Sequence, residues 1–231
     1  MRGPEELNAA PKTELKTELK TERSRLRRLH ERGHYDRESV YAILDATPLC
    51  HLGTVQDGAP VVTPTLQWRE GDRVYWHGSN ASRALRASVG AEVCLTVSML
   101  DGLVLARSGF HHSANFRSVT IFGRAEKLED PQQKAEKLRV FLDGLYPGRW
   151  DTLRPATDQE IKATAVLSMP IDEASAKVRT GGPVDDEPDY ALKVWGGVLP
   201  IRQVVGEPIP CPRNPDGLAI PSTRYSDSST S

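Results

Sequence analysis

A short run of hydroxyl and basic residues is the part of this chain best suited to bind an anion. It reads Ser79-Asn80-Ala81-Ser82-Arg83 and lies where a strand is expected to end and a helix to begin. Hydroxyl groups and free backbone amides at such a turn attract a negative group, and an arginine adds a planar set of donors. The pattern suits a terminal phosphate. The same residues also fit an ordinary helix cap flanked by exposed arginines.

A histidine, His77, ends the strand that precedes this turn. The pKa of an imidazole lies close enough to neutrality for the ring to hold or release a proton during a reaction. His77 is therefore a candidate proton source. The alternative is that it is a surface histidine, or one whose hydrogen bonds are satisfied within the fold, and the sequence leaves both open.

The paired histidines do not predict a metal site. His111 and His112 are adjacent, and adjacent residues of a strand point to opposite faces, so they cannot both bind one ion in regular geometry. No carboxylate or cysteine is expected to complete a ligand set there. His30 and His34 have helical spacing, but no second signal accompanies them. We expect no metal ligands.

Several familiar chemistries lack their patterns. There is no Gly-x-Ser-x-Gly elbow for a hydrolase and no Gly-x-Gly-x-x-Gly run between a strand and a helix for a dinucleotide fold. The cysteines, Cys50, Cys94 and Cys211, are odd in number and widely spaced, without a Cys-x-x-Cys pair. They indicate free thiols in a reducing compartment, and therefore a cytoplasmic protein, rather than disulfides or a zinc site.

Composition excludes some partners. The chain has 231 residues and a formal net charge of −1, so nothing favours nucleic acid or an anionic membrane surface as a partner. No long uncharged apolar run predicts a membrane span, and the N-terminus lacks the apolar core of a signal peptide.

The elements that position these candidate residues are expected to be many short strands separated by turns, with three helices on the outside. This arrangement predicts a mainly antiparallel β-barrel with peripheral helices. The expected strands cover residues 49–55, 61–68, 73–77, 93–99, 103–107, 116–128, 165–169 and 173–179. The expected helices cover residues 37–46, a short stretch through Ala84, Leu85 and Ala87 that begins after the signal 79–82 and ends at Gly90, and 131–145.

We expect three segments along the chain. Residues 1–24 contain the repeat Thr-Glu-Leu-Lys and predict a flexible or helical leader. Residues 25–205 form the barrel domain. Residues 206–231 are rich in proline, serine, aspartate and threonine and predict a disordered C-terminal tail.

The order of these features resembles the pyridoxamine 5'-phosphate oxidase-like family of FMN-binding split β-barrels. The branch it looks most like is that of flavin-nucleotide-binding proteins and 5-nitroimidazole reductases. The resemblance rests on the hairpin 53–68, the strand ending at His77, the turn 79–86 and the stretch Asn115–Arg124. The resemblance covers roughly residues 25–205. It depends on the order and spacing of these features, because no single motif among them is specific to the family.

The resemblance implies FMN as the cofactor and gives roles to particular residues. The phosphate would be held by Ser79, Ser82 and Arg83, and the flavin ring would be contacted by the strand that carries Thr63 and Thr65. His77 would lie near the flavin on the substrate side. Further cofactor contacts are implied for Asn115, Arg117, Ser118 and Trp195. Alternatives stay open: a simple strand with a bulge at Pro64, a structural ion pair for Arg117, and core packing for Trp195.

The activity implied by the resemblance is that of an oxidoreductase. Electrons would pass from a reduced nicotinamide through FMN to a small acceptor such as a nitroaromatic or a quinone. The alternative is a non-catalytic protein that binds flavin, deazaflavin (F420) or haem. Pyridoxamine phosphate oxidation is less expected, because an arginine-rich C-terminal motif is not evident in residues 200–231. The family also implies a homodimer with FMN at its interface, where Arg117 could reach the flavin of the other subunit.

Overall fold

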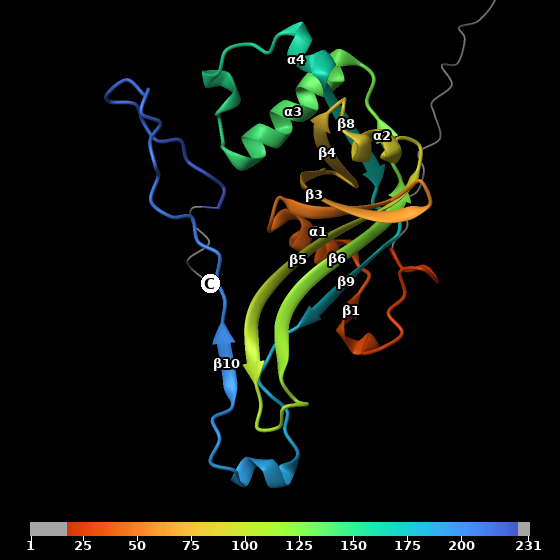
Figure 1. The fold of residues 1–231 in the computed structure, drawn as a ribbon, viewed down its shortest axis with the longest axis vertical. Helices are drawn as coiled ribbons and strands as arrows, with labels where there is room; N and C mark the ends of the chain where they lie inside the picture. The colour runs from red at the N-terminus through yellow and green to blue at the C-terminus, as the bar shows by residue number, and fades with distance from the viewer. Residues whose placement is uncertain (1–17, 226–231) are drawn as a thin grey trace, which may run out of the picture.

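A ten-stranded antiparallel sheet dominates the structure, a computed structural model that describes residues 18–225 (Figure 1). The spatial order of the strands is β1-β9-β6-β5-β2-β3-β4-β8-β7, and β10 pairs with β5 outside this path. The strands are β1 (Gly33–His34), β2 (Leu49–Gln56), β3 (Ala59–Glu70), β4 (Arg73–Ser79), β5 (Glu92–Leu105), β6 (Ser113–Arg124), β7 (Glu126–Lys127), β8 (Thr164–Pro170), β9 (Ala174–Arg179) and β10 (Gly197–Pro200). The predicted fold class, a mainly antiparallel split barrel with peripheral helices, is confirmed.

Helices cover the sheet at its ends and along one side (Figure 1). The α-helices are α1 (Arg37–Asp45), α2 (Arg83–Ser88), α3 (Pro131–Leu145) and α4 (Asp158–Ala163). Short 3-10 helices lie at His30–Arg32 (η1), Trp150–Thr152 (η2) and Glu187–Ala191 (η3). The Asp36 side chain caps α1, the helix predicted over 37–46, by accepting from the Ser39 backbone N–H at 2.8 Å. No helix within residues 18–225 is long and apolar enough to cross a lipid bilayer.

The barrel core lies between the inward faces of the long strands. In β2 the inward residues alternate with half-exposed ones, as the period of a strand requires. Cys50 and Leu52 contribute to the core from β2, Leu95 from β5 and Ile121 from β6, and all four are almost fully buried. α1 closes one side of this core with its apolar face, Val40, Ile43 and Leu44.

The two strands predicted over 93–99 and 103–107 are one strand with a β-bulge. β5 runs through Asp101-Gly102 with a register shift between Leu100 and Gly102. β10 pairs with β5 at this point, with Pro200 opposite Gly102. A Cβ atom on Gly102 would lie 3.0 Å from the Val198 side chain, so glycine lets β10 approach closely.

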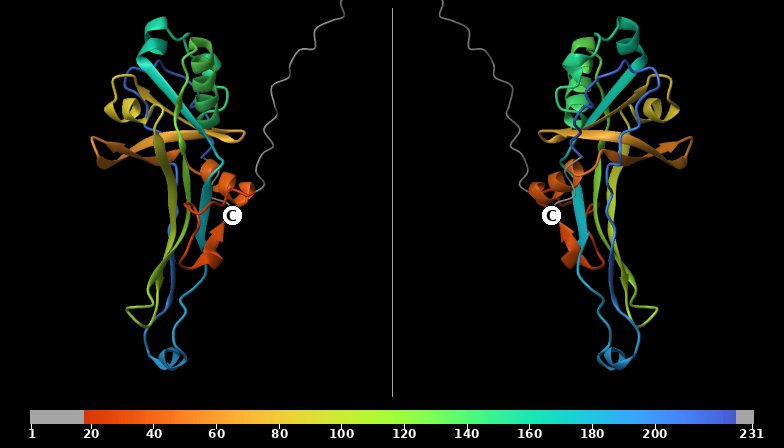
Figure 2. Two further views of the ribbon diagram at one scale, coloured as in Figure 1. Left: turned by 90° about the vertical axis from the view of Figure 1, so that its right-hand side faces the viewer. Right: turned by 90° about the vertical axis from the view of Figure 1, so that its left-hand side faces the viewer.

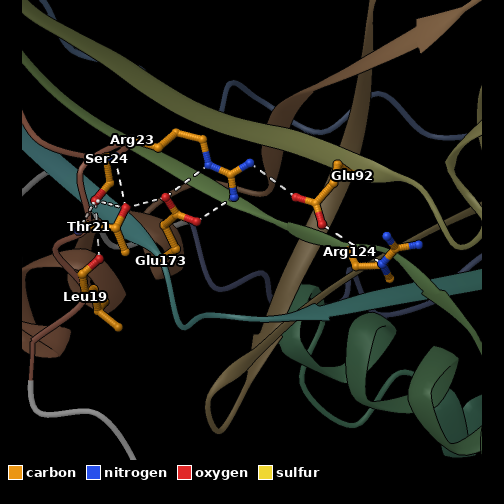
Figure 3. A network of polar contacts seen from close by, with 7 residues as sticks. All are labelled: Leu19, Thr21, Arg23, Ser24, Glu92, Arg124 and Glu173. Carbon is orange, nitrogen blue, oxygen red and sulfur yellow. Dashed lines mark hydrogen bonds and ion pairs between the residues drawn. The ribbon is translucent and has the colours of Figure 1, made fainter.

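The folded part begins earlier than residue 25. Leu19 has no exposed surface and belongs to the barrel core. Its backbone N–H donates to the Tyr35 carbonyl at 3.0 Å, and its carbonyl accepts from the Ala174 N–H at 3.0 Å. Arg23 bridges two carboxylates of the barrel, Glu173 at 3.0 Å and Glu92 at 3.2 Å (Figure 3). Residues 18–24 are therefore part of the barrel, which the predicted boundary of the leader missed.

The rest of the predicted leader, residues 1–17, lies outside the described residues. It contains the first Thr-Glu-Leu-Lys copy, and its expected flexibility or helicity stays a prediction. Within the described part, Glu18 and Lys20 are exposed while Leu19 between them is buried. The alternation shows that this stretch packs as an extended segment and not as a helix.

A long arm extends from the barrel (Figures 1 and 2). It consists of the far ends of β5 and β6, joined near residues 106–112, together with β10 and η3. From β10 the chain runs back along the molecule to α3, where Thr223 donates to the Leu145 carbonyl at 3.1 Å. Residues 206–222 form no helix or strand, but the following residues are anchored. The end of the predicted tail, residues 226–231, lies outside the described residues.

Candidate functional site

The predicted phosphate turn has the geometry of a capped helix start. The Ser82 side chain accepts from the Leu85 backbone N–H at 3.4 Å, and Ser79 accepts from the Ala81 N–H at 3.1 Å. Leu85 is buried in the barrel core and fixes the helix. The Asn80 backbone N–H donates to the Ala163 carbonyl at 2.8 Å, which ties the turn to α4 and β8. The turn is therefore a capped helix start that is hydrogen-bonded to the end of α4.

Arg83 is the free cation of this turn. Its side chain is exposed and forms no ion pair or hydrogen bond with any residue from 18 to 225. Its neighbour Arg86 differs, because one of its guanidinium nitrogens donates to the Ala81 carbonyl at 3.0 Å. An unpaired arginine beside two hydroxyl groups is a donor set that fits a phosphate. The phosphate role of Ser79, Ser82 and Arg83 stays a prediction that the geometry permits.

His77 faces an aromatic cluster beneath α3. Its ring centroid lies 4.8 Å from that of Phe141 and 5.9 Å from that of Trp68. The Nδ1 atom is buried and has no hydrogen-bond partner in the structure. Burial lowers the pKa of His77 because a low-dielectric environment disfavours the charged ring. His77 is therefore a neutral imidazole at neutral pH.

The strand that carries the two threonines turns them away from His77. Thr65 lies on the same face of β3 as Gln67, which pairs with Trp76 of β4. Paired residues share a face and successive residues alternate, so His77 points to the opposite face. Thr63 also points inward, opposite Leu52 of β2. Within one chain the structure does not bring His77 together with the Thr63 and Thr65 side chains.

Asn115 and Ser118 make contacts within their own chain. The Asn115 amide donates to the Gly181 carbonyl at 3.1 Å, and its oxygen accepts from Arg179. The Ser118 hydroxyl donates to the Lys177 carbonyl at 3.4 Å. These bonds join β6 to β9 and to the chain that follows β9. Contacts of Asn115 and Ser118 with a cofactor stay a prediction.

Arg117 forms the ion pair that the sequence left open as an alternative. Its guanidinium donates twice to the Asp101 carboxylate, at 2.9 and 2.8 Å. The hydrogen bonds that Arg117 donates to Asp101 raise the pKa of Arg117, so its guanidinium stays charged. Both side chains stay partly exposed, and a surface pair of this kind adds little to stability.

The Arg117–Asp101 pair lines a groove that we call the tail groove. It has a volume of about 990 Å³, a size that accommodates a nucleotide or another large ligand. Its walls come from the α1–β2 turn, from β5 and β6, and from the C-terminal segment. The lining residues are 45–48, 99–101, Arg117, 200–205, Arg224 and Tyr225.

Trp195 lies far from the core. It is 61% exposed and belongs to the segment between η3 and β10. Within one chain Trp195 therefore does not pack in the core, which was the alternative left open by the sequence. Phe110 at the end of the β5–β6 arm is 99% exposed. Large exposed aromatic side chains on one arm indicate a surface that a partner or ligand covers.

The sequence analysis missed His51. It lies half-buried on the outward face of β2, between Pro64 of β3 and Thr96 of β5. Its imidazole has no polar partner among the described residues. Leu49 and Val62 on the same face are 48% and 65% exposed. A single histidine at an outward position of an otherwise apolar strand was the available signal.

The expectation that no carboxylate accompanies His111 is wrong. Ligand atoms of His111, Asp186 and Asp189 all lie within 4.8 Å of one another. The His111 Nδ1 also lies 3.8 Å from Asp185. These acidic residues come from the η3 region, far along the chain, so spacing around His111 could not reveal them. The group is a cluster at the end of the arm and is not by itself evidence of a bound ion.

Asp185, in the chain that follows β9, is hydrogen-bonded to Arg107 at the end of β5. Burial raises the pKa of Asp185, but hydrogen bonds from the Arg107 backbone and side chain outweigh it, so the pKa lies below its usual value. The two bonds measure 2.9 and 3.0 Å. A buried carboxylate that is bonded in this way stays charged and holds the chain after β9 against the end of β5.

Comparison with known proteins identified relatives that match most of this chain. A family described as pyridoxamine 5'-phosphate oxidase matches residues 36–178. The structure of the flavocytochrome Anf3 from Azotobacter vinelandii is 56% identical, with a TM-score of 0.84, and the match covers 87% of this chain and 94% of that one. The structure of the FAD and heme binding protein from Mycobacterium smegmatis is 37% identical, with a TM-score of 0.78 and coverage of 82% and 94%.

A third structure shares the fold alone. It is a putative 5-nitroimidazole antibiotic resistance protein from Bacteroides thetaiotaomicron, 22% identical with a TM-score of 0.52. The match covers 63% of this chain and 86% of that one. A search of curated proteins found no match.

Proposed function

We propose that this chain, which belongs to the pyridoxamine 5'-phosphate oxidase-like family of flavin-binding split β-barrels, is a redox protein that carries a flavin together with a haem. The observation that carries the proposal is the 56% identity, over 87% of the chain, to a flavocytochrome. The FAD and heme binding protein, at 37% identity, supports the same pair of cofactors. Membership of the flavin-binding family supports the flavin half independently.

The C-terminal part of the chain supports the likeness to these two relatives. The family match ends at residue 178. Both relatives match a larger share of this chain than the residues up to 178 could supply. The likeness therefore extends beyond residue 178. The fold-level relative, the nitroimidazole resistance protein, matches only 63% of the chain.

The phosphate turn is where the chain would hold the flavin. Ser79, Ser82 and Arg83 supply hydroxyl and guanidinium donors with Arg83 unpaired. FMN and FAD share the phosphate next to the ribityl chain, so this turn suits both. The name of the Mycobacterium smegmatis relative favours FAD. When bound, a flavin accepts two electrons from a donor such as a reduced nicotinamide and releases them singly to a one-electron carrier.

His51 is the histidine that best fits a haem ligand. Haem iron is commonly held by a histidine, which needs a ring nitrogen free of other partners. His51 meets this need, and exposed apolar side chains surround it. Two of the other histidines fit less well: His77 faces the aromatic cluster under α3, and His112 bonds the Ser108 carbonyl. A flat apolar macrocycle would cover the face around His51.

The same face supports a homodimer. Leu49, Val55, Val62, Leu66 and Leu100 are each between 38% and 67% exposed on the outward faces of β2, β3 and β5. An exposed apolar patch of this kind usually marks an interaction site, and twofold dimers are the commonest assembly. Val62→Lys should shift the protein to monomer in light scattering after size-exclusion chromatography. A variant that stays dimeric would place the interface elsewhere.

An anaerobic titration with a reduced nicotinamide tests the redox function. The flavin bands should bleach, and the haem should then show the sharp absorption of the ferrous form. Adding a quinone or a nitroaromatic should restore the oxidised spectrum. If dithionite reduces both cofactors but the nicotinamide reduces neither, the protein is a binding or relay protein with another donor. If no flavin is present, the proposal fails.

A further inference from the structure

We propose that the end of the arm binds a divalent transition cation of the zinc class, held by His111, Asp186 and Asp189. The sequence predicted no metal ligands, because no carboxylate was expected beside the histidine. The structure brings two carboxylates to it, with ligand atoms of the three residues all within 4.8 Å of one another. This site goes beyond the proposed function and uses none of the residues assigned to the flavin or the haem.

The three ligands come from two parts of the arm that other contacts already hold together. His111 lies in the loop between β5 and β6, whereas Asp186 directly precedes η3 and Asp189 lies within it. The residue before this pair, Asp185, accepts from the Arg107 backbone and side chain at 2.9 and 3.0 Å. The end of β5 is therefore bonded to the start of the acidic segment, and the ligand atoms converge without help from an ion.

The imidazole of His111 is free to bind a metal. Its Nδ1 atom is buried and has no hydrogen-bond partner, because the nearest Asp185 oxygen is 3.8 Å away, beyond the reach of a hydrogen bond. A buried polar atom without a partner costs free energy unless a water molecule or an ion satisfies it. The side chain as a whole is 32% exposed, so an ion can enter from solvent and keep a water ligand.

The two carboxylates lack a cation of their own. Asp186 stands where an aspartate usually caps a helix, yet its side chain accepts no hydrogen bond from η3. Neither Asp186 nor Asp189 forms an ion pair through its side chain with a residue from 18 to 225, and the guanidinium of Arg107 is used by Asp185. Carboxylates at this separation repel each other, and a divalent ion between them removes the repulsion.

The donor set selects the class of ion. An imidazole nitrogen suits zinc and its neighbours in the transition series, whereas magnesium and calcium prefer oxygen ligands alone. Three protein ligands and a water molecule are the usual coordination of an open zinc site. At bond lengths of about 2.0–2.2 Å, tetrahedral ligand atoms lie about 3.4 Å apart. The side chains of Asp186, which is exposed, and Asp189, which is partly exposed, can rotate to close the remaining distance.

A bound ion would cross-link the loop between β5 and β6 to η3. Phe110 next to His111 is 99% exposed, and Tyr190 next to Asp189 is 47% exposed. The ion would therefore fix the part of the arm that presents these aromatic side chains to a partner or ligand. We assign it this structural role.

Titration of the purified holoprotein with zinc chloride, measured by calorimetry after treatment with EDTA, tests the proposal. One variant is His111→Gln. The other combines Asp186→Asn with Asp189→Asn, which keeps the shape of both side chains and removes their charge. The control is Asp57→Asn, an exposed carboxylate in the β2–β3 turn that also has no partner among residues 18–225.

The wild type should bind one zinc ion per chain, and magnesium chloride should bind far more weakly. Both variants should weaken zinc binding by roughly tenfold or more, since losing even an outer partner of a ligand has an effect of this size. The control should bind zinc as the wild type does. Without metal, thermal unfolding of the Asp186→Asn, Asp189→Asn variant should agree with that of the wild type, because the replaced groups have no partner.

Hydrogen exchange of the wild type gives a second readout that needs no variant. Zinc chloride should slow the exchange of backbone amides in residues 108–112 and 185–191, because the ion joins these two segments. Exchange in the β2–β3 turn should stay the same.

Three results would overturn the inference. Absence of zinc binding is one. Zinc binding that the variants and the control share equally, without slower exchange in the arm, would mean an adventitious ion only. Magnesium binding as tight as that of zinc would remove the assignment to a transition cation. A protein without flavin or haem bands would refute the proposed function instead, and the zinc titration would still decide whether the arm binds a metal.

Discussion

Replacing Arg83 with alanine tests the phosphate turn. Its guanidinium forms no ion pair or hydrogen bond with a described residue, so the free energy of unfolding should change by less than about 0.5 kcal/mol. If the group donates to the flavin phosphate, its loss should weaken flavin binding by roughly 1.5–3 kcal/mol, the range for a charge-assisted hydrogen bond. At about 1.4 kcal/mol per factor of ten, the dissociation constant rises roughly 10- to 150-fold.

The assay is a fluorescence titration of protein freed of its flavin, with FMN and FAD in turn. Arg86→Ala is the matched control, because the Arg86 guanidinium is already used by the Ala81 carbonyl at 3.0 Å. Its flavin affinity should stay close to that of the wild type. Ser82→Ala should in addition lower the free energy of unfolding by about 1 kcal/mol, because it removes the cap of α2. An Arg83→Ala variant that binds flavin as tightly as the wild type would remove Arg83 from the phosphate site.

Three further changes follow from the structure. His51→Ala should abolish the Soret band and leave the flavin bands, whereas His112→Ala should keep both. A Soret band that persists in His51→Ala would assign the iron to another ligand. Because burial lowers the pKa of His77 below 6.5, the unfolded chain takes up a proton first on acidification. The free energy of unfolding, measured with urea, should therefore fall as the pH drops below about 6.5, and His77→Phe should reduce that fall. The same dependence on pH in the wild type and the variant would contradict this prediction. Leu19→Ala should lower the free energy of unfolding by about 2–5 kcal/mol in the same assay. A variant as stable as the wild type would show that residues 18–24 do not stabilise the core.

The fold could be predicted because its signals are local. Alternating burial in β2, the Asp36 cap of α1 and the hydroxyl-rich start of α2 all lie within a few residues of the elements they specify. The same applies to Asp130 and Pro131 at the start of α3. Such patterns depend on strand period and capping chemistry, which hold wherever the element is placed.

The site could be predicted only in part, because it depends on contacts between distant segments. The partner of Arg117 is Asp101 in a neighbouring strand, and His111 meets acidic residues more than 70 positions later. Leu19 is buried by packing against a strand near residue 174, which a repeat of Thr-Glu-Leu-Lys does not reveal. His51 was missed because its importance lies in the exposed apolar face around it. A linear pattern does not encode these neighbours.

The absorption spectrum of the purified holoprotein, with mass spectrometry of the cofactors released by heat, tests the central claim most directly. The account predicts flavin bands together with a Soret band, and masses of a flavin and of haem. Flavin bands without a Soret band would leave the flavoprotein and remove the haem. A colourless protein that takes up neither added flavin nor added haem would contradict the proposed function while leaving the fold unchanged.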